Sequence, residues 1–118
     1  EPKRRPVTLV GDGAFQMSAQ ELSTLGRHQC RAIVLLMNND GYTTERIIHE
    51  GPYNDIQPWD YHRLPEVFGA GWGRRVTTED ELDEALERAR SDAEGPALVE
   101  IMLDRFDTTE ALKTLGKS

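Results

Sequence analysis

Cysteine is almost absent from this sequence, since Cys30 is the only one among 118 residues. A single cysteine excludes an internal disulfide framework and is compatible with a cytoplasmic setting. Long apolar runs are also lacking: the longest covers residues 32–37, against the roughly 20 residues that a membrane-spanning helix needs. A basic stripe is missing too. The formal net charge of −7 argues against nucleic acid as a partner.

The sequence has no internal repeat and no low-complexity linker. Its length suits a single domain with one hydrophobic core. The chain begins at Glu1 rather than at methionine, so we expect a processed product or a fragment of a longer protein. Because the chain is acidic, an anionic ligand has to be held by local groups such as backbone amides or a bound metal ion.

Short apolar runs recur along the chain and predict strands. Residues 7–10 and 32–37 are continuous apolar runs that stop at glycine- or asparagine-rich turns, as buried strands do. Residues 97–103 form a third run of this kind after the break at Gly95-Pro96, and residues 72–76 are a weaker strand candidate.

Helical patterns separate these strands. Residues 18–27 begin with a Ser-x-x-Glu capping box, which predicts a helix. Thr78 and Glu81 form a second capping box, and from Leu82 onward apolar residues follow at i, i+3, i+4 and i+7. Further helices are predicted over residues 61–68 and 108–115, and an irregular loop over residues 51–58.

Strands that alternate with helices predict an α/β fold built from βαβ units. We expect a three-layer sandwich in which helices cover both faces of a mostly parallel sheet. In such sheets ligands bind beyond the carboxyl ends of the strands. The turns that follow residues 7–10 and 32–37 should both lie at that edge.

These two turns carry a candidate metal site. Asp12 lies between Gly11 and Gly13, where glycines let backbone amides approach a phosphate closely. A lone carboxylate would repel that phosphate unless a divalent cation lay between them, and Mg²⁺ is often shared in this way. Alone, the first turn is also compatible with an ordinary glycine turn. Asn39 and Gly41, after the next strand, can add an amide oxygen and a carbonyl oxygen to the same ion.

The pattern Gly-Asp-Gly, then 24 residues, then Asn38-Asn39 resembles the thiamine-diphosphate enzymes. The resemblance implies the thiamine-diphosphate-binding fold, incomplete here, with residues 1–118 as the C-terminal part of the domain that holds the diphosphate and Mg²⁺. It assigns the Mg²⁺ ligands to Asp12, Asn39 and the Gly41 carbonyl. Cofactor contacts are implied at Gly11, Asp12, Gly13, Ala14, Asn39, Gly41, Tyr42 and Thr43.

The neighbouring residues resemble pyruvate and indolepyruvate decarboxylases. The similar stretches are residues 11–15, 19–22, 38–45, 48–49, 51–56, 59–61 and 104–116. This resemblance implies non-oxidative decarboxylation of a 2-oxo acid to an aldehyde and CO₂. Glu45 would transfer protons near the reactive carbon of the cofactor, in a closed pocket. Considered without the family, Glu45 is a solvated charge on a short helix.

Thr44 departs from the family pattern, because these decarboxylases usually carry Ile or Val at the matching position. The resemblance places Thr44 and Ile48 in the substrate pocket. Thr44 removes apolar volume and adds a hydroxyl, so a 2-oxo acid larger than pyruvate, such as phenylpyruvate or indolepyruvate, is a candidate substrate.

Family members are homo-oligomers in which the pyrimidine-binding domain of another subunit completes the site, and no segment here matches that domain. We therefore expect either a fragment or a small subunit, inactive in isolation. Two alternatives stay open: a non-catalytic cofactor-binding module, and a carboligase similar to acetolactate synthase. The histidines show no zinc-ligand spacing, and the tyrosines and tryptophans are expected in the core or at subunit contacts.

Overall fold

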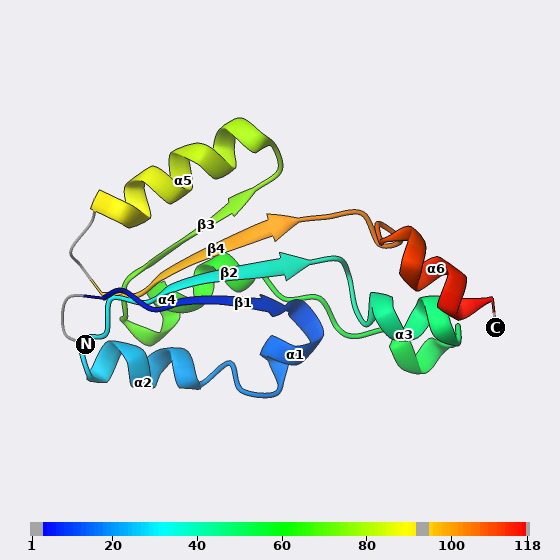
Figure 1. Ribbon diagram of the computed structural model, residues 1–118. Helices are drawn as coiled ribbons and strands as arrows, with labels where there is room; N and C mark the ends of the chain where they lie inside the picture. The colour runs from blue at the N-terminus through cyan, green and yellow to red at the C-terminus, as the bar shows by residue number, and fades with distance from the viewer. Residues whose placement is uncertain (1–3, 92–94, 118) are drawn as a thin grey trace.

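A computed structural model describes residues 4–91 and 95–117 of the chain. Four strands form one sheet in the order β1-β2-β4-β3, and all three pairings are parallel (Figure 1). The strands are β1 (Val7–Gly11), β2 (Ile33–Asn38), β3 (Trp72–Val76) and β4 (Ala97–Met102). The predicted parallel sheet is confirmed, and the weaker strand candidate forms one edge of it.

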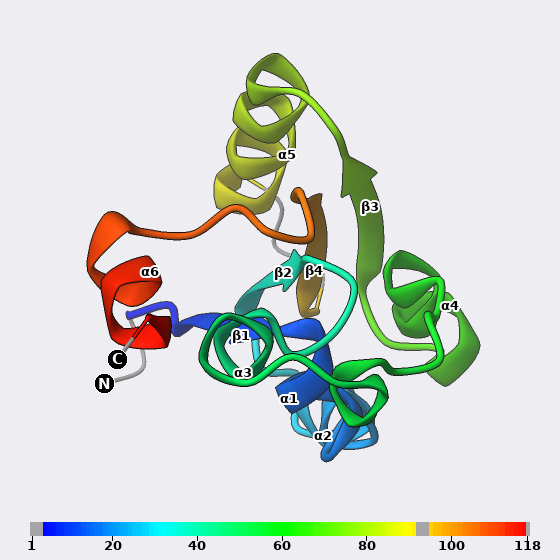
Figure 2. The same cartoon turned by 90° about the vertical axis from the view of Figure 1, so that its right-hand side faces the viewer.

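Helices cover both faces of the sheet, which confirms the three-layer prediction. α1 (Asp12–Gln16), α2 (Glu21–Arg27) and α4 (Leu64–Phe68) lie against one face, and α5 (Glu79–Ser91) lies against the other (Figure 2). The buried residues between the sheet and the first layer are Phe15, Ala19, Leu22, Val34, Leu36, Tyr61 and Leu98. Those under α5 are Ile33, Val76, Ala85, Ala89, Ala97 and Val99.

The two predicted capping boxes have different outcomes. At α5 the Glu81 amide donates to Thr78 Oγ1 over 3.1 Å, as predicted. At α2 no side-chain cap forms, because the Glu21 amide donates instead to the Ser18 carbonyl oxygen over 3.0 Å. The predicted helix over residues 18–27 is therefore wrong at its start.

The segment after β1 forms two short helices, and the first of them, α1, was not predicted. Phe15, Ala19 and Leu22 are spaced as on one helical face, and all three are buried in the same cluster. The chain turns between α1 and α2, yet it keeps these side chains against the sheet. The apolar spacing thus continues across both short helices, whereas the predicted helix boundary was wrong.

Two more helices lie beyond the carboxyl ends of the strands, away from the layers. They are α3 (Thr43–Ile48) and α6 (Glu110–Gly116), and they pack on each other (Figures 1 and 2). Their contact depends on Gly116, where a Cβ atom would lie 2.1 Å from the Ile47 carbonyl oxygen. α6 confirms the helix predicted over residues 108–115 with small shifts at both ends.

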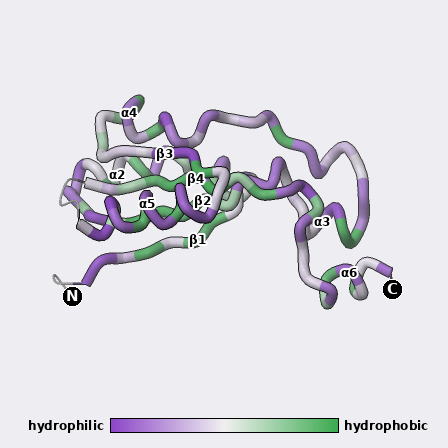
Figure 3. Tube along the Cα trace, turned by 90° about the horizontal axis from the view of Figure 1, so that it is seen from above, coloured by the Kyte–Doolittle hydropathy of each residue, from purple (hydrophilic) through white to green (hydrophobic). Residues whose placement is uncertain are grey.

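Short 3₁₀ turns η1 (Pro52–Asn54) and η2 (Tyr61–Arg63) complete the described chain. The predicted helix over residues 61–68 is divided between η2 and α4. Hydrophobic stretches run along β1, β2 and β4 through the middle of the molecule (Figure 3). Among the described helices, none has the length and apolar character needed to cross a membrane.

Candidate functional site

The two loops expected at the carboxyl edge of the sheet do meet there. β1 and β2 are neighbours, and Gly11 at the end of β1 pairs with Met37 near the end of β2. Asp12 follows directly, and its Oδ2 accepts a hydrogen bond of 2.8 Å from the Gly41 amide. The first loop is thereby joined to the second.

Three side-chain and backbone oxygens can converge at this contact. One terminal atom of the Asn39 amide lies 3.0 Å from both Asp12 Oδ1 and the Gly41 carbonyl oxygen, and the other lies 3.0 Å from Thr43 Oγ1. Adjacent oxygen ligands of an octahedral ion with bonds of about 2.1 Å are separated by about 3.0 Å. With the Asn39 oxygen facing inward, its separations from the Asp12 and Gly41 oxygens therefore both match those between adjacent ligands of a Mg²⁺ octahedron.

The proton of the Thr43 hydroxyl favours this orientation of the Asn39 amide. Thr43 Oγ1 donates to the Arg105 carbonyl oxygen over 2.8 Å, and a hydroxyl has only one proton to give. Toward Asn39 it must then accept, which places the amide nitrogen on that side and the amide oxygen beside Asp12 and Gly41. In this orientation the oxygens of Asp12, Asn39 and Gly41 face one another without a proton between them, and a bound cation would offset their repulsion. In a metal-free protein the reversed amide can donate to Asp12 and Gly41 instead.

Asp12 lies in surroundings that suit a metal ligand, with only 1% of its surface exposed. Burial raises the pKa of its carboxyl, although the backbone amides of Gly41, Gly13 and Asp12 itself partly oppose this effect. The described residues contain no cluster of three or more acidic, histidine or cysteine side chains able to hold a metal. A site here therefore consists of one carboxylate, one amide and one carbonyl, which are hard oxygen donors of the kind Mg²⁺ takes.

The backbone of the second loop is unusual at two consecutive residues. Asp40 has φ of 58° and Gly41 has φ of 116°. A Cβ atom on Gly41 would lie 2.4 Å from Arg46 Nη2 and 2.6 Å from the Asn54 carbonyl oxygen. Glycine is required at this position both for its backbone conformation and for the close approach of these groups.

Arg46 holds this loop from the side of α3. Its guanidinium is buried, and Nη2 donates to the carbonyl oxygens of Asp40 and Asn54 and, over 2.9 Å, to Asp55 Oδ1. Arg105 Nη2 donates to the same Asp55 oxygen over 2.6 Å. Arg46 and Arg105 were not among the site residues predicted from the sequence. The sequence holds only a weak signal for Arg46: it lies three residues after Thr43, on the same face of a short helix.

The other predicted cofactor contacts lie around the same edge. Gly13 is buried beneath the Tyr42 ring, where a Cβ atom would lie 2.5 Å from Tyr42 Cε1. Ala14 is exposed. A Cβ atom on Gly11 would have no heavy atom within 4 Å, so open space faces that glycine.

The predicted catalytic and substrate residues share the outer face of α3. Thr44 and Glu45 are exposed, and Ile48 is 49% exposed. Thr43 and Arg46 occupy the buried face of the same helix. The described residues alone do not form the closed pocket that we expected around Glu45.

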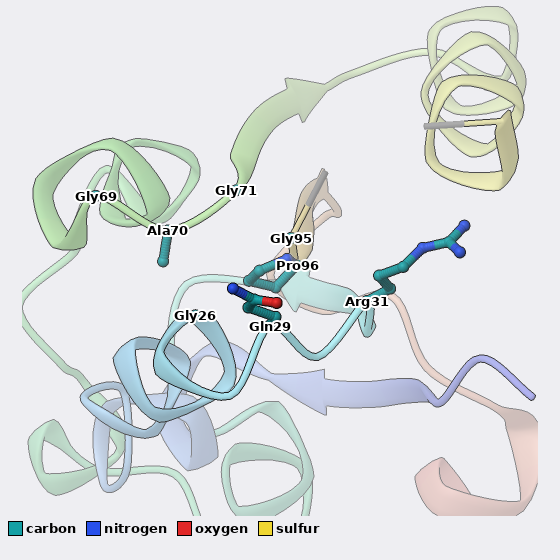
Figure 4. A pocket seen from close by; sticks show the side chains of 8 residues that line it. All are labelled: Gly26, Gln29, Arg31, Gly69, Ala70, Gly71, Gly95 and Pro96. Carbon is teal, nitrogen blue, oxygen red and sulfur yellow. The ribbon is translucent and has the colours of Figure 1, made fainter. Parts of the chain in front are cut away.

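A separate cavity of about 400 Å³ lies at the opposite edge of the sheet, before the amino ends of β2, β3 and β4 (Figure 4). It is bordered by the end of α2 and by backbone at Gly71 and Pro96, which approach so closely that a Cβ atom on Gly71 would lie 1.7 Å from the Pro96 carbonyl oxygen. The cavity shares no residue with the loops around Asp12.

Proteins similar to this chain in sequence include pyruvate decarboxylases. The chain is 41% identical over 121 aligned residues to a probable pyruvate decarboxylase of Schizosaccharomyces pombe, covering 99% of this chain and 21% of that protein. It is 43% identical over 119 residues to a pyruvate decarboxylase of Neurospora crassa, covering 98% of this chain and 21% of that protein. The chain thus spans about a fifth of the length of these relatives.

Solved structures show the same fold. The benzoylformate decarboxylase of Polynucleobacter necessarius matches with a TM-score of 0.79 and 26% identity, covering 88% of this chain and 20% of that one. A thiamine diphosphate-dependent 4-hydroxybenzoylformate decarboxylase of Rhodococcus jostii matches with a TM-score of 0.80 and 24% identity, covering 92% and 21%.

The family profile described as "Thiamine pyrophosphate enzyme, C-terminal TPP binding domain" matches residues 1–101, which is most of the chain. Thiamine diphosphate, predicted from the spacing of the two loops and their resemblance, is the cofactor named by this family. The chain therefore belongs to the thiamine pyrophosphate enzymes, in the family of their C-terminal cofactor-binding domain.

Proposed function

We propose that this chain is the Mg²⁺- and diphosphate-binding part of an enzyme that decarboxylates a 2-oxo acid to an aldehyde and CO₂. The observation that carries the proposal is the 3.0 Å spacing of the Asn39 amide from Asp12 Oδ1 and from the Gly41 carbonyl oxygen. The names of the relatives, several of them pyruvate decarboxylases, support the reaction class. Residues 1–118 then represent the C-terminal part of the cofactor domain.

Asp12, Asn39 and the Gly41 carbonyl would hold Mg²⁺, and the ion would neutralise the diphosphate beside the Asp12 carboxylate. Amides of Gly13 and Ala14, with Tyr42 and Thr43, would complete the contacts around the diphosphate. Gly11 would add a further cofactor contact, because the open space beside it allows close approach. When bound, the cofactor supplies the electron sink that CO₂ loss requires. The work of these residues is to bind and orient it.

Glu45 is proposed to move protons at the reacting end of the cofactor. Glu45 lies four residues after Gly41, on the face of α3 turned away from the buried contacts. It can therefore face a ligand that lies against the Gly41 loop. Thr44 and Ile48 share that exposed face and would line the substrate pocket. Thr44 has less apolar volume than the usual Ile or Val and adds a hydroxyl, so the pocket would accept a substrate larger than pyruvate, with phenylpyruvate and indolepyruvate as the candidates.

Exposed apolar side chains at this end of the molecule support a partner surface. Ile48, Tyr53, Phe106 and Leu115 are each about half exposed or more, on or beside α3 and α6. Apolar groups gathered at one end of a protein mark an interface more often than a free surface. We propose that a pyrimidine-binding domain, supplied by another subunit of a homo-oligomer, covers them. A cytoplasmic location stays a prediction that rests on the lone cysteine.

The test is a calorimetric titration of the intact protein with Mg²⁺ and thiamine diphosphate. Asp12→Ala should weaken cofactor binding by at least about 100-fold, because the only charged metal ligand is lost. Asp83→Ala, on the exposed surface of α5, is the matched control and should bind as the parent does. Unchanged binding in Asp12→Ala would overturn the metal assignment.

A second experiment tests the reaction by following aldehyde release from pyruvate, phenylpyruvate and indolepyruvate. Acetolactate as the product would indicate a carboligase instead.

A further inference from the structure

Glu100 is a carboxylate in the middle of the sheet with no exposed surface. It lies on β4, where its neighbours along the strand are apolar, and a buried charge is unfavourable unless other groups compensate it. Burial alone raises the pKa of this carboxyl. Hydrogen bonds from Asn38 and His62, together with the charge of Arg75, outweigh that effect and hold the pKa below its usual value, so Glu100 is ionised at neutral pH.

Four contacts surround the two carboxylate oxygens. Asn38 Nδ2 donates to Oε2 over 2.7 Å, and Arg75 Nε lies 3.4 Å from the same oxygen. The His62 amide lies 3.1 Å from Oε1, and His62 Nδ1 lies 2.9 Å from it. Glu100 therefore connects β2, η2 and β3 to β4. The connection to β2 leads to the loop that carries Asn39 and Gly41.

The connection to this loop is made by the side chain of Asn38. An ionised carboxylate only accepts hydrogen bonds, so Glu100 requires Asn38 to present its amide nitrogen. The Asn38 oxygen must then point the other way, where it accepts from the Asp40 amide over 3.2 Å. A neutral partner at position 100 would leave the Asn38 amide free to reverse. The reversed amide would turn its nitrogen toward the Asp40 amide, so that two hydrogen-bond donors would face each other.

The Asp40 peptide depends on such support. Its φ of 58° lies in the left-handed region that non-glycine residues seldom adopt. Asn38 holds its amide, and Arg46 holds its carbonyl oxygen. Asn39 and Gly41, the two loop residues assigned to Mg²⁺, lie immediately on either side of this peptide.

We propose that Glu100 is a positioning residue for the metal site: through Asn38 it fixes the Asp40 peptide, and thereby the separation of the Asn39 and Gly41 oxygens. Glu100 itself touches neither cofactor nor metal in this arrangement. The inference rests on the proposed function, since it concerns the same Mg²⁺ site. A purely structural role, in which Glu100 only joins the strands, is the contrasting explanation.

The test exchanges the polarity of the Asn38–Glu100 hydrogen bond. Glu100→Gln removes the requirement on the Asn38 amide and should weaken Mn²⁺ binding by about 10-fold or more. In the double variant Asn38→Asp/Glu100→Gln, the new carboxylate at 38 accepts from both the glutamine amide and the Asp40 amide, and the net charge is conserved. Binding should return to within about threefold of the parent.

Mn²⁺ binding to the intact protein is followed by electron paramagnetic resonance in the presence of thiamine diphosphate, and thermal unfolding is measured in parallel. Arg75→Gln is the matched control, because it removes a different partner of Glu100 and leaves the Asn38 bond. It should lower the unfolding temperature without changing Mn²⁺ affinity.

Two results would overturn the inference alone: parent-like Mn²⁺ affinity in Glu100→Gln, or a folded double variant that binds at least tenfold more weakly than the parent. If Glu100→Gln does not fold, the double variant still decides the matter. A parent protein that binds no Mn²⁺ with thiamine diphosphate would overturn the proposed function, and the inference with it.

Discussion

The Thr43 hydroxyl donates to the Arg105 carbonyl oxygen over 2.8 Å, and this bond favours the orientation in which the Asn39 amide oxygen faces Asp12. The only hydroxyl proton is committed to Arg105, so the amide nitrogen of Asn39 belongs on the Thr43 side. A residue of the segment after β4 thus influences the loop after β2, to which we assign Mg²⁺ ligands.

Thr43→Val should test this relationship, because valine keeps the shape of threonine and removes the hydroxyl. The Asn39 amide then loses its acceptor and the Arg105 carbonyl loses its donor. We expect Mg²⁺ affinity to fall by about 10-fold, measured by calorimetry with thiamine diphosphate present. Thr43→Ser keeps the hydroxyl and should bind like the parent. Equal affinities in the valine and serine variants would contradict the role given to the hydroxyl.

Asp12→Asn should stabilise the metal-free protein while it abolishes Mg²⁺ binding. Burial raises the pKa of Asp12, so the folded state binds this proton more tightly than the unfolded chain does. Stability therefore falls as pH rises from the unfolded value through the folded pKa, and at neutral pH the ionised carboxylate is a cost that asparagine removes.

The measurement is the unfolding temperature at pH 7, with chelator and with excess Mg²⁺ and cofactor. With chelator the variant should melt about 2 °C or more above the parent, and with Mg²⁺ and cofactor the parent alone should gain stability. A variant that melts below the parent in chelator would show that the Asp12 charge is compensated without a metal.

Gly41→Ala should cost both stability and metal binding. The new Cβ atom meets Arg46 Nη2 and the Asn54 carbonyl oxygen at φ of 116°, so the loop has to move. We expect a loss of about 2–3 kcal/mol in the free energy of unfolding. Gly69→Ala is the matched control, since Gly69 also has positive φ, 65°, but nothing lies within 4 Å of a Cβ atom there. Denaturant unfolding should show the smaller loss for Gly69→Ala, about 1 kcal/mol.

Much of the fold could be predicted from the sequence because its signals are local. The apolar runs that became β1, β2 and β4 and the capping box of α5 each depend on a few consecutive residues, and each was confirmed. The helix after β1 was wrong at its start, since the turn between α1 and α2 depends on packing against the sheet. Sequence periodicity carries no signal for such a turn.

The loops that carry Asp12 and Asn39 were expected at one edge, because parallel neighbouring strands end on the same side. The residues that hold those loops could not be predicted in the same way. Arg46 and Arg105 converge on Asp55 from separate segments, and only the folded chain shows that contact. Glu100 did leave a trace, as a single charge inside an apolar strand run, but its partners Asn38, His62 and Arg75 are distant in sequence.

Glu45→Gln should separate binding from chemistry in the intact enzyme. Glutamine keeps the size of glutamate and cannot exchange a proton, so cofactor and Mg²⁺ affinity should stay near the parent's while turnover falls by about 10²–10⁴-fold. Its exposed position on α3, outside the contacts that hold the Gly41 loop, makes a folding defect an unsuitable explanation for that loss.

Glu66→Gln on α4 is the matched control and should turn over normally. Steady-state kinetics with phenylpyruvate, paired with calorimetry, provide both numbers. If turnover in Glu45→Gln stayed within about twofold of the parent, Glu45 would be the solvated charge that its exposure in this chain suggests, and the proton-transfer residue would have to be sought elsewhere.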